Sequence, residues 1–306
     1  MRAAGIQNGM NAIPFVFVDV FSDRPLEGNP LAVVPDADSL DEATMRRIAR
    51  EFNQSETTFL LKPAEDDANW HLRSFTAAGH EVTGAGHNAL GAWWWLAVAG
   101  RLPLHDGTNE FRQKIAGRVL PLQVVSGGGA VRSIVMQHTA PEFGAMASDA
   151  RALADALGLD AEELLPEGRA AQVVSTGAAH LLIPVRDRSA IERAKPDAAR
   201  LLSILSASGG EGAYLFCRDV ARAGSAAHAR FFNPTMGISE DAATGTAAGP
   251  LGAWLVKEGL VREGSIRIEQ GFTMGRPSLI EIEVSSGGVS ISGRGCVSIE
   301  GTLRIA

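Results

Sequence analysis

The 306-residue sequence contains little cysteine, no excess of basic charge and no long apolar run, and each shortage excludes a class of protein. Its two cysteines, Cys217 and Cys296, are too few for a disulfide framework or a cysteine-based metal site. The net charge of −7 argues against nucleic acid or an anionic membrane surface as a partner. The most apolar stretch, residues 89–99, falls short of the ~20 residues that a membrane span needs. We therefore expect a soluble, reduced and cytoplasmic protein.

Several catalytic motifs are also absent from the sequence. It contains no Gly-x4-Gly-Lys-Ser/Thr loop, no Gly-x-Gly-x-x-Gly turn after a strand and no His-Glu-x-x-His. A Gly-x-Ser-x-Gly nucleophile turn is missing too. Of the seven histidines only His80 and His87 are near neighbours, so no metal site is expected. Carboxylates and histidine remain as the acid and base groups.

The two halves of the sequence match each other at three places, in the same order and about half the chain apart. The matched segments are 28–34 with 177–185, 73–76 with 230–233, and 90–93 with 251–254. The last pair is Leu-Gly-Ala-Trp in both copies. Because internal repeats of this kind indicate duplication, we predict two pseudo-equivalent halves that face each other.

Hydrophobic periodicity predicts an α+β fold. Residues 88–98 and 247–257 are apolar all round, which is typical of a buried helix. Further helices are expected at 40–52, capped by Asp38 or Ser39, and at 150–157. Short apolar runs predict strands at 15–21, 31–34, 57–61, 71–75, 118–125, 133–137, 171–174, 180–185, 213–217, 227–232, 266–270, 278–284, 289–293 and 295–301. Each half would be a curved, mostly antiparallel, barrel-like sheet wrapped around its central helix.

The repeat also predicts where the two halves begin and end. We expect an N-terminal half at residues 13–136, completed by a C-terminal strand at about 296–306, and a C-terminal half at 137–295. Residues 1–12 are polar and lack the basic start and apolar run of a signal peptide. They are expected to form a flexible extension.

A glycine-rich segment precedes each buried helix, at residues 79–88 and 237–246. Glycine lets the backbone approach a ligand closely, and the free N–H groups of a helix start attract anions. Gly86 and Gly245, with their neighbours, are therefore candidates for binding a small carboxylate and for stabilising an enolate formed beside it. The alternative is a pair of glycine-rich turns that bind nothing.

Glu56 is a further candidate, at the junction between a predicted helix and an apolar strand. Small polar residues surround it, and Phe52 and Phe59 are close in sequence. A carboxyl group partly removed from water would have a raised pKa, which suits proton transfer near neutral pH. The alternative is a surface glutamate at a helix end.

These segments resemble the PhzF-like family of phenazine biosynthesis, within the diaminopimelate epimerase fold superfamily. The resemblance spans nearly the whole chain and rests on residues 18–21, 28–33, 53–59, 84–87, 237–250, 271 and 275–278. It implies two similar halves with the active site between them, a homodimer, and no metal or organic cofactor. The activity implied is isomerisation of a dihydro-hydroxyanthranilate, in which a proton moves between carbons.

The resemblance also implies roles for individual residues. Glu56 matches the family's acid and base, while His87 and Asp241 would orient the substrate and tune Glu56. Thr246 stands where serine is common and keeps the hydroxyl group. The remaining residues of the predicted substrate site are Ser55, Gly86 and Gly245.

Some positions depart from the pattern of the wider superfamily. Its epimerases and racemases use two cysteines, whereas residues 85–87 and 244–246 hold none, which excludes a two-thiol mechanism. Ala77 replaces a usual proline, and the loop at 77–83, with His80 near the cleft, is unusual. Two alternatives therefore stay open. They are an epimerase or racemase of another amino or hydroxy acid, and a non-catalytic ligand-binding protein.

Overall fold

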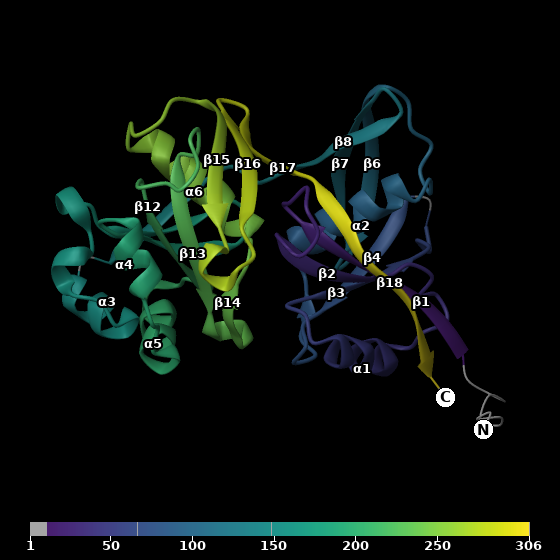
Figure 1. Cartoon of the computed structure of the whole chain (residues 1–306), viewed down its shortest axis with the longest axis horizontal. Helices are drawn as coiled ribbons and strands as arrows, with labels where there is room; N and C mark the ends of the chain where they lie inside the picture. The colour runs from purple at the N-terminus through teal and green to yellow at the C-terminus, as the bar shows by residue number, and fades with distance from the viewer. Residues whose placement is uncertain (1–10, 66, 148, 306) are drawn as a thin grey trace.

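The computed structural model describes residues 11–65, 67–147 and 149–305. It has two lobes side by side, one coloured purple to blue and the other teal to yellow (Figure 1). The last strand leaves the second lobe and runs back across the first. In the described part of the chain, no helix has the length and apolar character to cross a membrane.

The described part of the first lobe contains eight strands and two helices. The strands are β1 Asn11–Val20, β2 Asn29–Val34, β3 Thr57–Leu61, β4 Trp70–Phe75, β5 Glu81–Val82, β6 Gly107–Ile115, β7 Arg118–Gly127 and β8 Ala130–Gln137. The helices are α1 Glu42–Phe52 and α2 His87–Val98.

The rest of the chain forms the second lobe and the returning strand. Its strands are β9 Glu142–Ala147, β10 Ala171–Ser175, β11 Ala179–Pro184, β12 Gly212–Cys217, β13 Ala227–Asn233, β14 Ile238–Asp241, β15 Gly264–Gln270, β16 Ser278–Ser285, β17 Gly288–Gly293 and β18 Gly295–Ile305. Its helices are α3 Ala150–Leu157, α4 Arg188–Arg193, α5 Ala198–Ser208 and α6 Gly245–Lys257.

The order of strand pairings in the first lobe occurs again in the second. Strand β2 pairs antiparallel with β1 and parallel with β3, and β11 pairs in the same way with β10 and β12. Strand β4 lies antiparallel to β3 and parallel to β6. In the second lobe, β13 lies antiparallel to β12 and parallel to β15. Thr57 faces Phe75 in one register, and Ala213 faces Phe232 in the other. The sheet is mixed, and antiparallel pairs predominate, as predicted.

Helices α2 and α6 are buried along most of their length. Helix α2 packs against β1, β2, β3 and β8, while α6 packs against β10, β11, β16 and β17. Gly91 of α2 allows this close approach, because a Cβ atom there would lie 2.6 Å from Val20 Cγ2 and 2.7 Å from Leu31 Cδ2. The glycine of the repeated Leu-Gly-Ala-Trp segment therefore serves helix–sheet packing.

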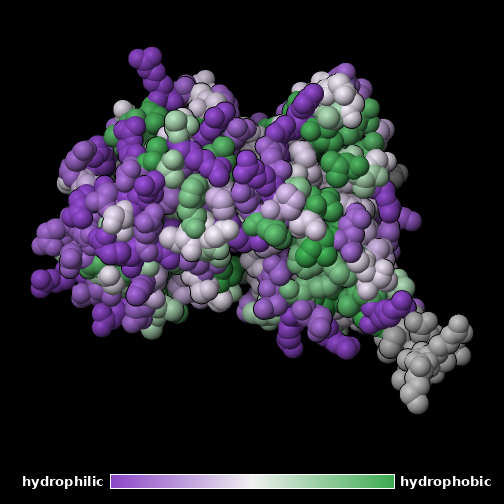
Figure 2. Space-filling view, viewed as in Figure 1, coloured by the Kyte–Doolittle hydropathy of each residue, from purple (hydrophilic) through white to green (hydrophobic). Residues whose placement is uncertain are grey.

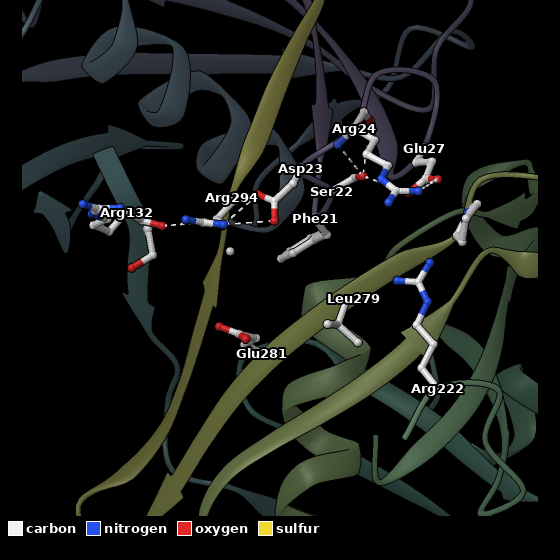
Figure 3. A pocket seen from close by; sticks show the side chains of 13 residues that line it. Phe21, Ser22, Asp23, Arg24, Glu27, Arg132, Arg222, Leu279, Glu281 and Arg294 are labelled. Atoms are coloured by element: carbon white, nitrogen blue, oxygen red, sulfur yellow. Dashed lines mark hydrogen bonds and ion pairs between the residues drawn. The ribbon is translucent and has the colours of Figure 1, made fainter. Parts of the chain in front are cut away.

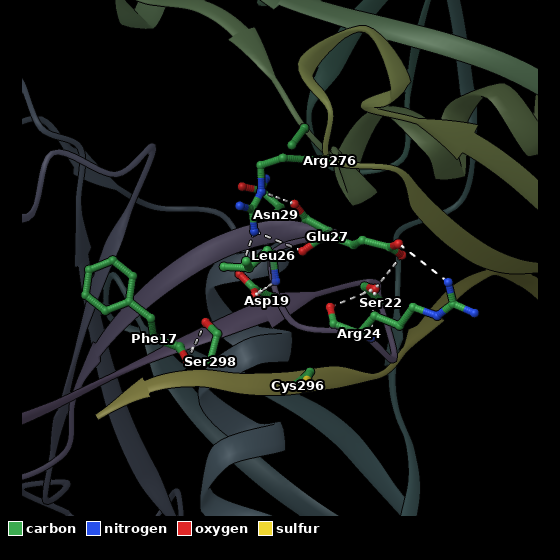
Figure 4. A network of polar contacts seen from close by, with 12 residues as sticks. Phe17, Asp19, Ser22, Arg24, Leu26, Glu27, Asn29, Arg276, Cys296 and Ser298 are labelled. Atoms are coloured by element: carbon green, nitrogen blue, oxygen red, sulfur yellow. Dashed lines mark hydrogen bonds and ion pairs between the residues drawn. The ribbon is translucent and has the colours of Figure 1, made fainter. Parts of the chain in front are cut away.

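Arg276, in the turn before β16, ties the second lobe to the first. Its Nη2 donates to Asp19 Oδ1 at 2.6 Å and to the Glu27 carbonyl oxygen at 2.9 Å (Figure 4). Its Nε donates to the Gly28 carbonyl oxygen at 2.8 Å. Asp19 is only 2% exposed, so this guanidinium supplies the countercharge that a buried carboxylate needs.

Two expectations about the fold need correction, and several elements were not predicted at all. Asn11 and Ala12 were expected in a flexible extension, but they belong to β1, because they pair with Ile305 and Arg304 of β18. The rest of the predicted extension, residues 1–10, lies outside the described residues. Helix α1 begins at Glu42, where the Asp41 side chain accepts the Thr44 N–H at 2.8 Å, so neither Asp38 nor Ser39 caps it. The elements that the sequence did not predict are β5, β6, β9, β14, α4 and α5.

Strand β6 shows why such elements were missed. Its four buried positions alternate correctly along the strand, but two of them are the polar residues Asn109 and Gln113. Both side chains have hydrogen-bond partners on other elements: Asn109 donates to the Val124 carbonyl, in addition to the nearby His105 carbonyl, and Gln113 accepts from Trp93 Nε1. A hydrophobic period cannot reveal positions that are buried through tertiary hydrogen bonds.

Candidate active site

A cavity of about 250 Å³ lies where the first turns of α2 and α6 meet. A Cβ atom on Gly86 would lie 3.5 Å from Thr246 Cγ2, so the two helix starts face each other directly. All seven residues predicted for the site line this cavity: Ser55, Glu56, Gly86, His87, Asp241, Gly245 and Thr246. His80, in contrast, is exposed and does not line it.

A larger cavity of about 620 Å³ lies elsewhere between the lobes (Figure 3). Phe21 and Leu279 lie near its middle, and charged side chains surround them. Arg294 and Asp23 pair there at 2.9 Å, with their side chains 45% and 64% exposed. Exposed pairs of this kind contribute little free energy and provide no buried acid or base. The smaller cavity is therefore the candidate active site.

Glu56 lies at the point where the chain turns from α1 into β3. Asn53 ends α1 in a left-handed conformation (φ 51°), and the buried strand starts at Thr57. The Glu56 side chain is 15% exposed, and its Oε2 has no hydrogen-bond partner among the described residues. Burial raises the pKa of Glu56, and the charge of Asp241 raises it further, whereas His87 opposes the shift. Such a group can both accept and return a proton.

His87, the first residue of α2, lies between the carboxyl group and a hydroxyl group. Its Nδ1 is 3.7 Å from Glu56 Oε2, and its Nε2 is 3.5 Å from Ser55 Oγ. The ring is 6% exposed, so packing limits its movement. It can orient a substrate group beside Glu56.

Asp241 is held from both lobes, and both of its carboxylate oxygens are occupied. Asn29 Nδ2 donates to Oδ1 at 2.8 Å, and Thr244 Oγ1 donates to Oδ2 at 2.5 Å. Gln270 Nε2 supports this arrangement by donating to Thr244 Oγ1 at 3.0 Å. Asn29, Thr244 and Gln270 were not among the residues predicted for the site. Asn29 and Thr244 lie in the segments that resemble the family, whereas no local pattern marks Gln270.

Not all of the backbone N–H groups that were expected to bind a carboxylate at the two helix starts are free. Gly86 N–H donates to Asn88 Oδ1 at 2.7 Å, so it is not free to bind a ligand in this structure. The next amides of α2, together with those of Gly245 and Thr246 in α6, are first-turn donors without an intrahelical acceptor. The lack of a side chain at Gly245 allows Ile291 to pack against the helix start, because a Cβ atom there would lie 2.2 Å from Ile291 Cδ1 in its present position.

The charged groups in the wall are acidic. No lysine or arginine lines the described cavity, whereas Glu56, Glu81, Glu211 and Asp241 do. Glu81 is neutralised by Arg73 at 2.7 Å, and Glu240 pairs in the same way with Arg230 at 2.8 Å in the second lobe. An anion in this cavity would therefore depend on donors other than lysine and arginine, such as the backbone N–H groups and hydroxyls at the helix starts.

The two cysteines lie away from this cavity. Cys217 ends β12 and Cys296 lies in β18, and neither lines the wall. Burial raises the pKa of the Cys217 thiol to about 12. This placement agrees with the prediction that no thiol pair stands at the helix starts. Within the described residues, no cluster of three or more His, Cys, Asp or Glu side chains is arranged to hold a metal ion.

Comparison with known proteins gives consistent relatives over nearly the whole chain. The family model of phenazine biosynthesis-like proteins, PhzC-PhzF, matches residues 18–301. The trans-2,3-dihydro-3-hydroxyanthranilate isomerase of Pseudomonas fluorescens is 34% identical over 296 residues, covering 92% of this chain and 98% of the relative. Solved structures are similar as well, including the following two. A PhzF-family phenazine biosynthesis protein of Bacillus anthracis has a TM-score of 0.86 at 27% identity, over 97% and 100% of the two chains. A protein of Pseudomonas aeruginosa described as a predicted epimerase has a TM-score of 0.80 at 34% identity, over 95% and 99%.

Proposed function

The chain belongs to the PhzC-PhzF family of phenazine biosynthesis-like proteins and is an isomerase, and from this premise we propose that it moves a proton between carbons of a small cyclic amino or hydroxy acid, with Glu56 as acid and base. The observation that carries the proposal is the buried Glu56 carboxyl group beside His87, in the cavity between two helix starts. Its Oε2 has no hydrogen-bond partner among the residues that the structure describes. The substrate named for the Pseudomonas fluorescens relative, a dihydro-hydroxyanthranilate, is the model for this substrate class.

The substrate carboxylate binds at the facing first turns of α2 and α6. Helix starts carry partial positive charge and free N–H groups, so they bind an anion without a lysine or arginine. At the α6 start, the N–H groups of Gly245 and Thr246 bind the carboxylate. At the α2 start, the N–H groups that follow Gly86 bind it. The same groups stabilise the negative charge that spreads through the conjugated ring during the reaction.

Glu56 transfers the proton without oxidation or reduction. As a carboxylate it takes a proton from a carbon that conjugation has activated. As a carboxylic acid it returns the proton to another carbon on the same face. Its raised pKa suits both steps, because a proton carrier works best when its pKa is near the working pH. His87 and Asp241 hold the amine or hydroxyl group of the substrate.

Isotope transfer tests this function. Trans-2,3-dihydro-3-hydroxyanthranilate carrying deuterium on the carbon that loses its proton is incubated with the enzyme in ordinary water. We expect an isomer that retains much of the label, because one carboxyl group carries it from carbon to carbon. An epimerase or racemase would exchange the label with solvent, and a binding protein would yield neither exchange nor isomer. Either result on a proven ligand contradicts the proposal.

The hydroxyl of Thr246 is expected to matter more than its methyl group. Thr246→Val removes a donor at the α6 start and should lower kcat/KM about 10²-fold, the scale of losing one donor to a developing anion. Thr246→Ser keeps the hydroxyl and should stay within a few-fold of the natural enzyme. Steady-state kinetics of the two variants makes the comparison. Equal activity of Thr246→Val and Thr246→Ser would remove Thr246 from the substrate site.

We also propose the finer organisation expected from the sequence. The chain consists of two duplicated units. The first is residues 13–136 with about 296–306, and the second is residues 137–295. The repeated order of strand pairing supports this proposal.

The protein acts as a homodimer in the cytoplasm without a cofactor. Apolar surface gathers on the first lobe in Figure 2, and Ile299 of β18 is 48% exposed. Light scattering should give about twice the chain mass of 32.2 kDa, and the mass of one chain would contradict a dimer.

A further inference from the structure

His180 is a buried cavity-wall residue that the mechanism above does not use. It lies in β11 of the second lobe, is 3% exposed, and its Nε2 is 3.3 Å from Thr246 Oγ1. Phe231 packs edge-on against the ring, with centroids 5.0 Å apart. Gly212, opposite His180 on β12, leaves room for this pair of rings, because a Cβ atom there would lie 2.5 Å from Phe231 Cζ and 3.3 Å from His180 Nδ1. Packing therefore fixes one ring nitrogen on Thr246 and buries the other.

The two nitrogens of this ring have unequal surroundings. Nε2 faces a hydroxyl that can donate or accept, whereas Nδ1 is buried without a hydrogen-bond partner among the described residues. Burial also lowers the pKa of His180 to about 4, so the ring is neutral at physiological pH and carries one proton. The position of that proton decides which way the Thr246 hydroxyl points.

The surroundings favour a proton on Nε2. A proton on Nδ1 would be a buried donor without an acceptor, which native proteins rarely tolerate. A proton on Nε2 finds an acceptor in Thr246 Oγ1 and leaves only a bare lone pair at Nδ1. Once Thr246 Oγ1 accepts from His180, its own hydroxyl proton must be donated elsewhere, and the cavity is the open direction.

We propose that His180 is a positioning residue, whose Nε2–H donates to Thr246 Oγ1 and so presents the Thr246 hydroxyl proton to the substrate carboxylate. This inference rests on the proposed function for the identity of the substrate group, but its first test does not. The α2 start is arranged differently: its own first residue, His87, has Nε2 3.5 Å from Ser55 Oγ, and the Asn88 side chain accepts the Gly86 N–H. The two helix starts are therefore prepared for the anion in different ways.

Nitrogen NMR of the free, full-length protein at pH 7 tests the tautomer directly. A long-range proton–nitrogen spectrum distinguishes a protonated ring nitrogen from a bare one, and the His180→Gln variant identifies the signals by their loss. We expect the proton on Nε2. A proton on Nδ1, or a doubly protonated ring, overturns the inference and leaves the proposed function standing, because no substrate is involved.

Kinetics tests whether His180 acts through Thr246. His180→Phe keeps a ring but removes the donor, and should lower kcat/KM about tenfold, whereas His180→Gln restores an N–H and should recover part of the loss. In the double variant with Thr246→Val, the activity should equal that of Thr246→Val alone. His71→Phe, at a histidine outside the cavity wall, is the matched control and should leave activity unchanged. If the two single losses multiply in the double variant, His180 does not act through Thr246.

Discussion

Glu56→Gln is expected to lower turnover by about 10²–10⁴-fold, the usual contribution of a positioned acid or base. Glutamine keeps the size and polarity of the side chain but cannot carry a proton between carbons. The substrate carboxylate still binds at the helix starts, so KM should change much less than kcat. Initial rates on a proven substrate measure both constants. Glu51→Gln, at an exposed position on α1 with the same change of charge, is the control and should leave turnover intact.

The same variant should be more stable than the natural protein at alkaline pH. Because burial raises the pKa of Glu56, the folded state binds its proton more tightly than the unfolded state does. The stability linked to that proton is present at low pH and is lost as the pH rises through the raised value. Glutamine resembles the protonated form at every pH. Thermal unfolding of both proteins should therefore diverge as the pH rises, and near-natural turnover or an unchanged stability profile would contradict the role of Glu56.

Arg276→Met should destabilise the fold by about 3–5 kcal/mol, the usual cost of removing one partner from a buried ion pair. Methionine fills part of the space but leaves Asp19 buried with the Leu26 N–H as its remaining partner at 2.7 Å. The lobes also lose the bonds from Arg276 to the Glu27 and Gly28 carbonyls. Urea unfolding measures the loss in free energy of unfolding.

Arg294→Met provides the matched control for this prediction. Arg294 also pairs with an aspartate of the first lobe, Asp23, but both side chains are about half exposed. Such a pair contributes about 0–1 kcal/mol, so the control should change stability little. Replacing both Arg276 and Asp19, by Met and Asn, should recover part of the loss, because no unpaired charge is left inside. Equal destabilisation by Arg276→Met and Arg294→Met would show that the Arg276 contacts do not hold the lobes.

Local sequence features were sufficient for the elements around the site. The apolar residues of α2 and α6 predicted two buried helices, and both are buried, beginning one and two residues before the predicted positions. Glu56, His87 and Asp241 were assigned through motifs, and the structure brings them to one cavity. The matched segments 28–34 and 177–185 correspond to β2 and β11, which hold equivalent places in the pairing order. Each of these features can be recognised from short segments of sequence, without knowing which distant residues they contact.

Other features depend on residues far apart, and no local pattern contains them. The Ile291 side chain of β17 packs where a side chain at 245 would lie, and the Asn88 side chain occupies the amide of Gly86. Gln270 supports Asp241 through Thr244 from 26 residues away, and His180 reaches Thr246 from 66 residues away. Hydrogen bonds of this kind are directional and short-ranged, so only the folded positions of both partners define them.

The sequence by itself determined the composition class, the two buried helices, the repeated segments and the acid and base candidates. It could do so because periodicity and motif spacing are properties of neighbouring residues. The tertiary structure decided what those residues face: Glu56 is buried beside His87, Asp241 is fixed from both lobes, and the Thr246 hydroxyl lies against His180. Burial and the distances to nearby charges set the pKa of Glu56, and contacts with other elements orient the hydrogen-bond donors. Burial and these contacts exist only once distant segments are packed together.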